Sequence, residues 1–246
     1  MEYKTLKKII IYVFYTSSGM AWNENLQAQP VKSMIPCVAI CVPHFSSVNM
    51  EWVESTWGPL RYIPQPDFAK TPRLSRGILN LDTHRNELVR SALADKAVTH
   101  ILFLDSDVVA ESPSDINEAL RMLLSTNSPI ASGLYRAKKL KGQYPYAMWM
   151  KNPNGIGYLG IESWTGNWIK VSVIGFGFVL LKREVFETVP FPWFVWKDVS
   201  PSEDFYACEL FAKYGFETRV LTSVQLSHQG GLKVLCKDGK VTSFDV

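Results

Sequence analysis

Two carboxylates, Asp105 and Asp107, follow the apolar run His100–Leu104 and are separated by a single serine. The run predicts a buried strand, so both acids come at its carboxyl end. Residues i and i+2 point to the same side while a strand persists, and two neighbouring carboxylates repel unless a positive charge lies between them. Mg²⁺ or Mn²⁺ bound by carboxylates commonly fills its shell with water and phosphate oxygens. We therefore predict a divalent-cation site here; a metal-free Asx-type turn is the alternative.

A second acidic pair, Glu203 and Asp204, follows Ser200-Pro201 near the start of a predicted helix. With Ser200 as N-cap and Pro201 first, Glu203 takes the third position of a capping box, which explains it without catalysis. Asp204 is not needed by that cap, although the helix dipole favours an anion there.

Arg85 and Asn86 lie in the first turn of a helix predicted over residues 83–97, with Thr83 as its cap. A cation in the first turn opposes the helix dipole, so Arg85 needs an anionic partner. A diphosphate, one of the acids above, or a salt bridge to Asp82 or Glu87 would each serve.

Strand and helix signals alternate along the chain and indicate an α/β fold with a mixed, mainly parallel sheet. Glycines at 175 and 177 interrupt a later strand region and suggest close backbone approach. Asp238-Gly239 predicts a late antiparallel hairpin. The further expected elements are strands at 38–42 and 129–135, helices at 49–56, 112–125 and 200–215, and an irregular proline-rich segment at 59–75.

Composition narrows the function without naming it. The chain has 246 residues, 47% of them hydrophobic and 20% charged, which is normal for one globular domain. A net charge of +3 is too mild for a dedicated nucleic-acid binder, so no nucleic-acid partner is expected. The four cysteines lack metal-ligand spacing and are read as buried, reduced thiols.

Residues 1–33 differ from the rest and form a predicted N-terminal extension to a domain at 34–246. Three early lysines precede the apolar run Ile9–Tyr15, which is too short to span a membrane. A cleaved leader, a membrane-surface helix and an extra strand are all open interpretations. We expect a cytoplasmic protein, either soluble or resting on a membrane surface through this basic terminus.

The order of motifs over roughly residues 35–232 resembles the GT-A-fold glycosyltransferases, in particular small bacterial, archaeal and viral enzymes related to family 2. The matching segments, in chain order, are VAICVP, HRNELVRSAL, HILFLDSDVV, ASGLYRAKK, GFGFVLLKREVF, SEDFYACELFAKYGF and QLSHQGG. The resemblance implies a single Rossmann-like α/β/α domain that uses Mn²⁺ or Mg²⁺ and a nucleoside-diphosphate-sugar donor, with a glycan, lipid or protein hydroxyl as acceptor.

The same resemblance implies roles for individual residues. Asp105, Asp107 and His228 would bind the cation, and imidazole suits Mn²⁺ better than Mg²⁺. Asp204, with Glu203 second, would be the acceptor-side base. Donor-binding residues would lie after the first strand, around the first long helix, at the acidic pair and beside the donor sugar: Pro43, His44, Phe45, Arg76, Arg85, Asn86, Asp105, Ser106 and Gly177. The aromatic run Trp193–Trp196 would either stack on acceptor sugars or close the core.

Two other functions fit the first acidic pair. Haloacid-dehalogenase-like phosphatases also carry an apolar strand followed by Asp-x-Asp, with Asp105 then the nucleophile and Asp107 the acid/base. Against this, Val109 stands where a Thr or similar residue usually follows, and the pair comes after at least one earlier strand and helix. A non-catalytic nucleotide-sugar or glycan-binding module is the third interpretation.

Overall fold

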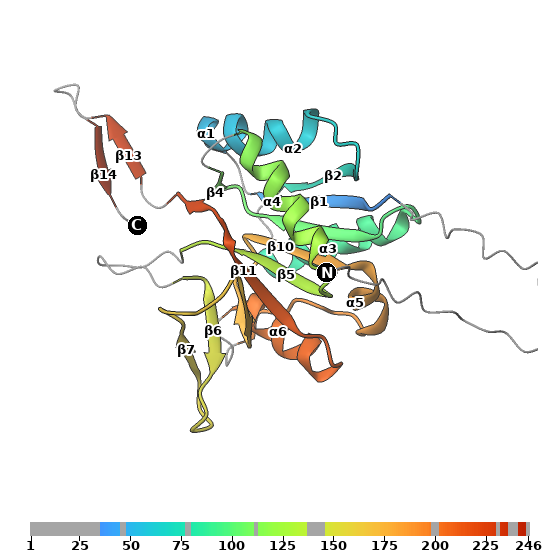
Figure 1. Cartoon of the computed structure of the whole chain (residues 1–246), viewed down its shortest axis with the longest axis vertical. Helices are drawn as coiled ribbons and strands as arrows, with labels where there is room; N and C mark the ends of the chain where they lie inside the picture. Colours follow the sequence, from blue (N-terminus) through green and yellow to red (C-terminus); the bar gives the residue numbers. More distant parts are fainter. Residues whose placement is uncertain are drawn as a thin grey trace, which may run out of the picture. The chain divides into compact units, whose positions relative to one another are not determined.

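A seven-stranded sheet organises the chain in the order β2-β1-β3-β10-β5-β11-β8 (Figure 1). The computed structural model describes residues 35–44, 48–76, 80–110, 113–136, 146–197, 202–229, 232–235 and 241–244. The strands of the sheet are β1 (Cys37–His44), β2 (Ala69–Arg76), β3 (His100–Leu104), β5 (Ile130–Leu134), β8 (Trp168–Val171), β10 (Phe178–Lys182) and β11 (Thr218–Gln225).

Five of these strands run in one direction. β1 pairs in parallel with β2 and β3, and β5 pairs in parallel with β11. β10 runs antiparallel between β3 and β5, and β8 runs antiparallel beside β11. This confirms the predicted mixed, mainly parallel sheet. The carboxyl ends of β1, β3, β5 and β11 therefore share one edge, where open α/β sheets bind ligands.

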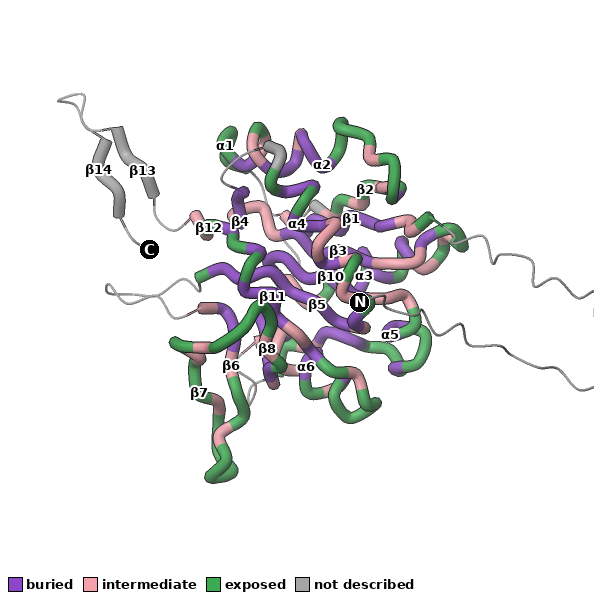
Figure 2. Tube along the Cα trace, viewed as in Figure 1, coloured by how far each residue is buried: buried purple, intermediate pink, exposed green. Residues whose placement is uncertain are grey.

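Helices cover both faces of the sheet, and alternate residues of β1 show why. Ala39 and Cys41 enter a core with α3 (Leu81–Ala94), α5 (Arg183–Thr188) and α6 (Glu203–Lys213). Val38 and Ile40 enter a second core with α1 (Met50–Trp52), the π-helical Val53–Trp57, α2 (Gly58–Tyr62) and α4 (Pro113–Ser125). A strand with both faces buried reads as an unbroken apolar run, as this one does (Figure 2). The α/β/α layering is confirmed.

Three small sheets complete the fold. β4 (Val108–Val109) pairs with β12 (Ser227–His228). β6 (Met148–Lys151) lies between β7 (Tyr158–Gly160) and β9 (Val173–Ile174). β13 (Leu232–Leu235) and β14 (Val241–Phe244) are the antiparallel arms of the predicted late hairpin.

Two segments differ from the sequence-based expectation. The segment expected to be irregular contains β2, which is an edge strand paired only with β1, so Pro72 leaves no ladder partner unsatisfied on its outer side. The helix expected to stop at Gly58-Pro59 instead continues as α2 to Tyr62, because a proline is tolerated in the first turn of a helix.

Two helix starts also differ. Asn80, not Thr83, is the N-cap of α3, which begins at Leu81. Ser202, not Ser200, is the N-cap of α6, so Glu203 is the first helical residue and the predicted capping box is wrong. Gly215 ends α6 as expected: its φ is +83°, and amide bonds from Gly215 to Ala212 and from Phe216 to Phe211 close the helix.

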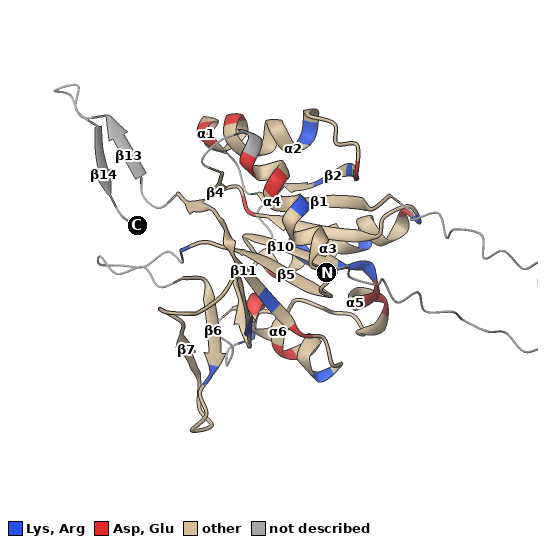
Figure 3. Ribbon diagram, in the orientation of Figure 1, with Lys and Arg blue, Asp and Glu red and all other residues tan. Residues whose placement is uncertain are grey.

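Three surface and compositional features accompany this fold. Basic and acidic residues are interspersed along the described helices and strands (Figure 3). Cys37, Cys41 and Cys208 are free thiols. No helix in the described ranges combines the length and apolar character needed to cross a membrane. The predicted N-terminal extension lies outside the described residues.

Candidate active site

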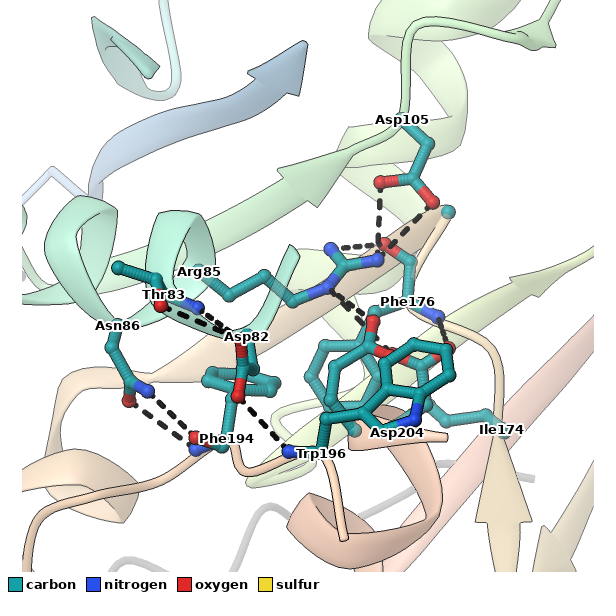
Figure 4. A network of polar contacts seen from close by, with 12 residues as sticks. Asp82, Thr83, Arg85, Asn86, Asp105, Ile174, Phe176, Phe194, Trp196 and Asp204 are labelled. Carbon is teal, nitrogen blue, oxygen red and sulfur yellow. Dashed lines mark hydrogen bonds and ion pairs between the residues drawn. The ribbon is translucent and has the colours of Figure 1, made fainter. Parts of the chain in front are cut away.

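A buried arginine joins the two predicted acidic pairs (Figure 4). Arg85 is only 1% exposed, and its Nη2 lies 3.2 Å from each carboxylate oxygen of Asp105. Its Nε donates to Glu203 Oε1 at 3.2 Å and lies 3.7 Å from Asp204 Oδ1. Of the partners left open for Arg85, the structure shows the acids.

Aromatic rings and backbone groups complete the surroundings of this guanidinium. The rings of Phe103 and Phe176 have their centroids 5.3 and 5.6 Å from Arg85 Cζ. Arg85 Nη1 donates to the Phe176 carbonyl at 3.4 Å, and the Phe176 amide donates to Asp204 Oδ2 at 3.3 Å. The segment before β10 therefore fixes the arginine and Asp204 at once.

Charge in this cluster is unbalanced, since three carboxylates face one guanidinium. Burial raises the pKa of Asp204 well above its ordinary value; Arg85 lowers it, and Glu203 and Asp105 raise it further. Burial likewise raises the pKa of Asp105; the charge of Arg85 lowers this pKa, and the charge of Asp107 raises it. Burial alone would lower the pKa of Arg85, but the carboxylates outweigh it and raise that pKa. A proton on this cluster is therefore held more tightly than on a free carboxylate.

Asp107 and His228 lie together because β4 pairs with β12. His228 is opposite Val108, and the Gln229 amide donates to the Asp107 carbonyl at 2.7 Å. His228 Nδ1 lies 2.9 Å from the Arg136 carbonyl, which only accepts, so this nitrogen carries the hydrogen. His228 Nε2 then faces Asp107 Oδ1 at 3.3 Å. With the hydrogen on Nδ1, both Nε2 and the carboxylate oxygen are acceptors, so only a proton or a cation between them makes the contact favourable. A nitrogen and an oxygen ligand in this arrangement suit a divalent ion.

Asp105 does not join that pair. Val108 N donates to the Asp105 carbonyl at 3.2 Å, so the chain turns directly after β3 and the two carboxylates reach different partners. β3 ends at Leu104, so both aspartates follow the strand instead of belonging to it. Among the described residues, no group of three or more His, Cys, Asp or Glu is arranged to hold a metal ion.

Tyr135 is a site residue that the sequence reasoning missed. Its hydroxyl accepts from the Gly177 amide at 2.7 Å, and its ring lies edge-on to His228 with centroids 5.7 Å apart. A Cβ on Gly175 would lie 2.5 Å from this hydroxyl oxygen, and one on Gly177 would lie 2.8 Å from it. The two glycines did signal a close approach, and Tyr135 at the end of β5 is what approaches them.

The other residues predicted to bind the nucleotide-sugar donor lie in different parts of the structure. Asn86 is turned away from the acids: its side chain donates to the Phe194 carbonyl at 2.7 Å and accepts from the amides of Trp193 and Phe194. Pro43 and His44 end β1 at the ligand-binding edge, and Ser106 lies in the turn between the two aspartates. Arg76 ends β2, and Phe45 lies outside the described residues.

The aromatic run divides into core and surface. Trp193 and Phe194 are buried and pack against α5 and α6 residues, including Phe186 and Phe211. Trp196 is 55% exposed. Of the two interpretations left open, core closure holds for the first two aromatics, and only Trp196 stays available to a ligand.

Comparisons with known proteins agree with the geometry at the level of the fold. No family model and no curated protein matches the sequence. Among solved structures, A197 from STIV matches with a TM-score of 0.57 at 20% identity, over 86% of this chain and 95% of that one. A structure of GalNAc-T7 with UDP, GalNAc and Mn²⁺ matches with a TM-score of 0.51 at 10% identity, over 80% of this chain and 44% of that longer one. The chain has the mixed α/β fold of the GT-A type.

Proposed function

We propose that the protein is a metal-dependent glycosyltransferase that moves a sugar from a nucleoside-diphosphate-sugar to a hydroxyl acceptor. One observation carries the proposal: Asp105 and Asp204 share the buried Arg85, directly beside the Asp107–His228 pair. In this proposal, the cluster would bring a donor-side acid, an acceptor-side acid and a cation-binding pair together on a GT-A sheet. The GalNAc-T7 structure, which holds UDP, GalNAc and Mn²⁺, supports the assignment by fold alone.

Asp107 and His228 are the residues that would hold the cation. Their Oδ1 and Nε2 atoms face each other at 3.3 Å, and the mixed carboxylate and imidazole set favours Mn²⁺ over Mg²⁺. When bound, such an ion neutralises charge that develops on a departing diphosphate. Asp105 is held by Arg85 instead, so we assign it to the ribose side of the donor, with Ser106 beside it and Pro43, His44 and Phe45 toward the nucleobase. Arg76 is kept as a nucleotide contact and Gly177 as a neighbour of the donor sugar.

Asp204 is the group we assign to the acceptor hydroxyl. Its side chain stays 18% exposed while its pKa is raised, so it is both reachable and a stronger base than a free carboxylate. The Phe176 amide orients one of its oxygens. It would accept the hydroxyl proton as the oxygen attacks the sugar, if the reaction inverts.

Glu203 and Arg85 have positioning roles in this account. Glu203 is 2% exposed and bonded to Arg85, so it does not reach a substrate. This revises the expectation that Glu203 is a second catalytic acid and Arg85 a diphosphate ligand. Both instead fix the distance between Asp105 and Asp204.

The phosphatase alternative requires Asp105 to attack phosphorus as a free nucleophile. Both of its oxygens lie 3.2 Å from Arg85 Nη2, and this ion pair reduces their nucleophilicity. A non-catalytic module would keep the same cluster but turn over no donor.

The test is incubation with a panel of nucleotide-sugars and Mn²⁺, followed separately for nucleoside diphosphate and inorganic phosphate. Diphosphate release that is lost in Asp107→Ala supports the transferase. Phosphate release from simple phosphomonoesters, lost in Asp105→Asn, would instead identify a phosphatase. Tight donor binding without turnover would identify a binding module.

A further inference from the structure

Trp196 is exposed, yet its backbone is fixed. Its amide donates to Asp82 Oδ2 at 3.0 Å, which attaches it to the first turn of α3. Two residues earlier, Phe194 is 1% exposed in the core and bonded on both sides by Asn86. An indole that is 55% exposed on so firmly held a backbone is preorganised for a ligand, since little order is lost on binding.

The position of Trp196 relates it to the acidic cluster. Asp82, which holds its amide, precedes Arg85 by three residues on α3. The next residue, Lys197, places its ammonium 4.3 Å from the ring centroid of Tyr206, which follows Asp204 by two residues on α6. The segment Trp196–Lys197 therefore contacts both of the helices that supply Arg85 and Asp204, and Figure 4 draws Trp196 with that cluster.

The chemistry of the indole selects among acceptors. Its apolar faces bind flat, weakly polar surfaces, and the C–H face of a pyranose ring is such a surface. A serine or threonine hydroxyl, or a simple alcohol, offers no ring to stack on. Resting on the proposed function, we propose that Trp196 is an acceptor-subsite residue and that the acceptor is a carbohydrate presenting a pyranose ring to this indole, with its hydroxyl toward Asp204.

Trp168 supplies a matched control. Trp168 is 53% exposed, but it lies on β8, the edge strand at the far end of the sheet from β2, and Arg219 Cζ covers its ring at 4.6 Å. Trp168→Ala removes as much exposed indole without touching α3 or α6.

The first experiment measures binding without turnover. Saturation-transfer NMR with methyl glycosides of glucose, galactose, mannose and N-acetylglucosamine is recorded for wild type, Trp196→Ala, Trp196→Phe and Trp168→Ala, with glycerol as the ringless probe. We expect at least one glycoside to bind wild type and Trp168→Ala with similar affinity. The same glycoside should bind Trp196→Phe more weakly than wild type, and its affinity for Trp196→Ala should be lower than for wild type by about tenfold or more. Failure of all four glycosides to bind wild type, or equal loss in Trp168→Ala, would overturn the proposal.

The second experiment separates this proposal from the transferase assignment. Donor hydrolysis by water needs no acceptor ring, so Trp196→Ala should hydrolyse the donor at the wild-type rate while kcat/KM for the bound glycoside falls about tenfold. Loss of hydrolysis in the same proportion would mean that Trp196 is only structural. If wild type hydrolyses no donor, the proposed function fails, and the binding experiment still decides the carbohydrate subsite by itself.

Discussion

Arg85 Nε and Glu203 Oε1 lie 3.2 Å apart although 118 residues separate them, and both side chains are at most 2% exposed. The pair joins Arg85, the fifth residue of α3, to the first residue of α6. Each of these helices carries part of the candidate site, so the ion pair fixes Asp204 relative to Arg85 and, under the proposed function, the acceptor side relative to the donor side.

Replacing Arg85 by methionine should strongly destabilise the fold. Three carboxylates would remain around an apolar side chain, and breaking a buried pair in this way typically costs about 3–5 kcal/mol. Urea denaturation measures the loss, which should shrink at low pH as the acids become protonated. Arg121→Met is the control, because its partners Asp67 and Glu118 are exposed and the change should be small. Equal losses in the two variants would contradict the account.

Gly175→Ala should be tolerated better when Tyr135 lacks its hydroxyl. The new Cβ would meet the Tyr135 oxygen at 2.5 Å, and such overpacking costs about 1–3 kcal/mol. Tyr135→Phe removes that oxygen, at the cost of leaving the Gly177 amide without it. A double-mutant cycle of unfolding free energies should therefore show coupling between the two positions; strictly additive values would show that the clash is relieved elsewhere.

Activity and stability should change in opposite directions with pH at Asp204. As a base it works deprotonated, so transfer falls as the pH is lowered through its folded-state pKa, which lies well above the ordinary 3.8. A raised pKa also means that the folded state binds this proton more tightly, so stability is lost as the pH rises from about 3.8 to the folded-state value.

Asp204→Asn tests both trends together. It should lower transfer by about 10²–10⁴-fold and flatten this part of the stability profile. Glu209→Gln, on the exposed side of the same helix, should leave the pH–rate profile unchanged. An acidic limb at the ordinary carboxylate pKa, or an active Asp204→Asn variant, would remove Asp204 from the proposed role.

His228→Gln should raise the Mn²⁺ concentration needed for half-maximal activity and weaken Mn²⁺ binding measured by electron paramagnetic resonance. Because even outer-shell changes at metal sites cost about 10–100-fold, we expect a shift at least that large. His100→Gln is the matched control, because His100 begins β3, whereas the acidic pair follows the end of that strand. Unchanged Mn²⁺ binding in His228→Gln would place the metal elsewhere.

The sequence allowed prediction of what depends on local pattern. β3 coincides with its apolar run, α4 begins at Pro113, and Gly215 ends α6. β2 was missed because its stability comes from pairing with β1, and its own lysine, proline and two arginines give no strand pattern. For Arg85 the sequence left several anionic partners open, and its contacts with Glu203 and Asp204 could not be chosen among them, since they depend on how two distant helices pack against the sheet.

The measurement that tests the central claim most directly is Mn²⁺-dependent release of nucleoside diphosphate from nucleotide-sugars, compared between wild type, Asp107→Ala and the surface control Glu118→Ala. We predict release from at least one donor by wild type and Glu118→Ala, its loss on chelation of the metal, and its loss in Asp107→Ala. Two results would contradict the account: release that persists in Asp107→Ala, or a wild-type protein that releases nucleoside diphosphate from none of the nucleotide-sugars.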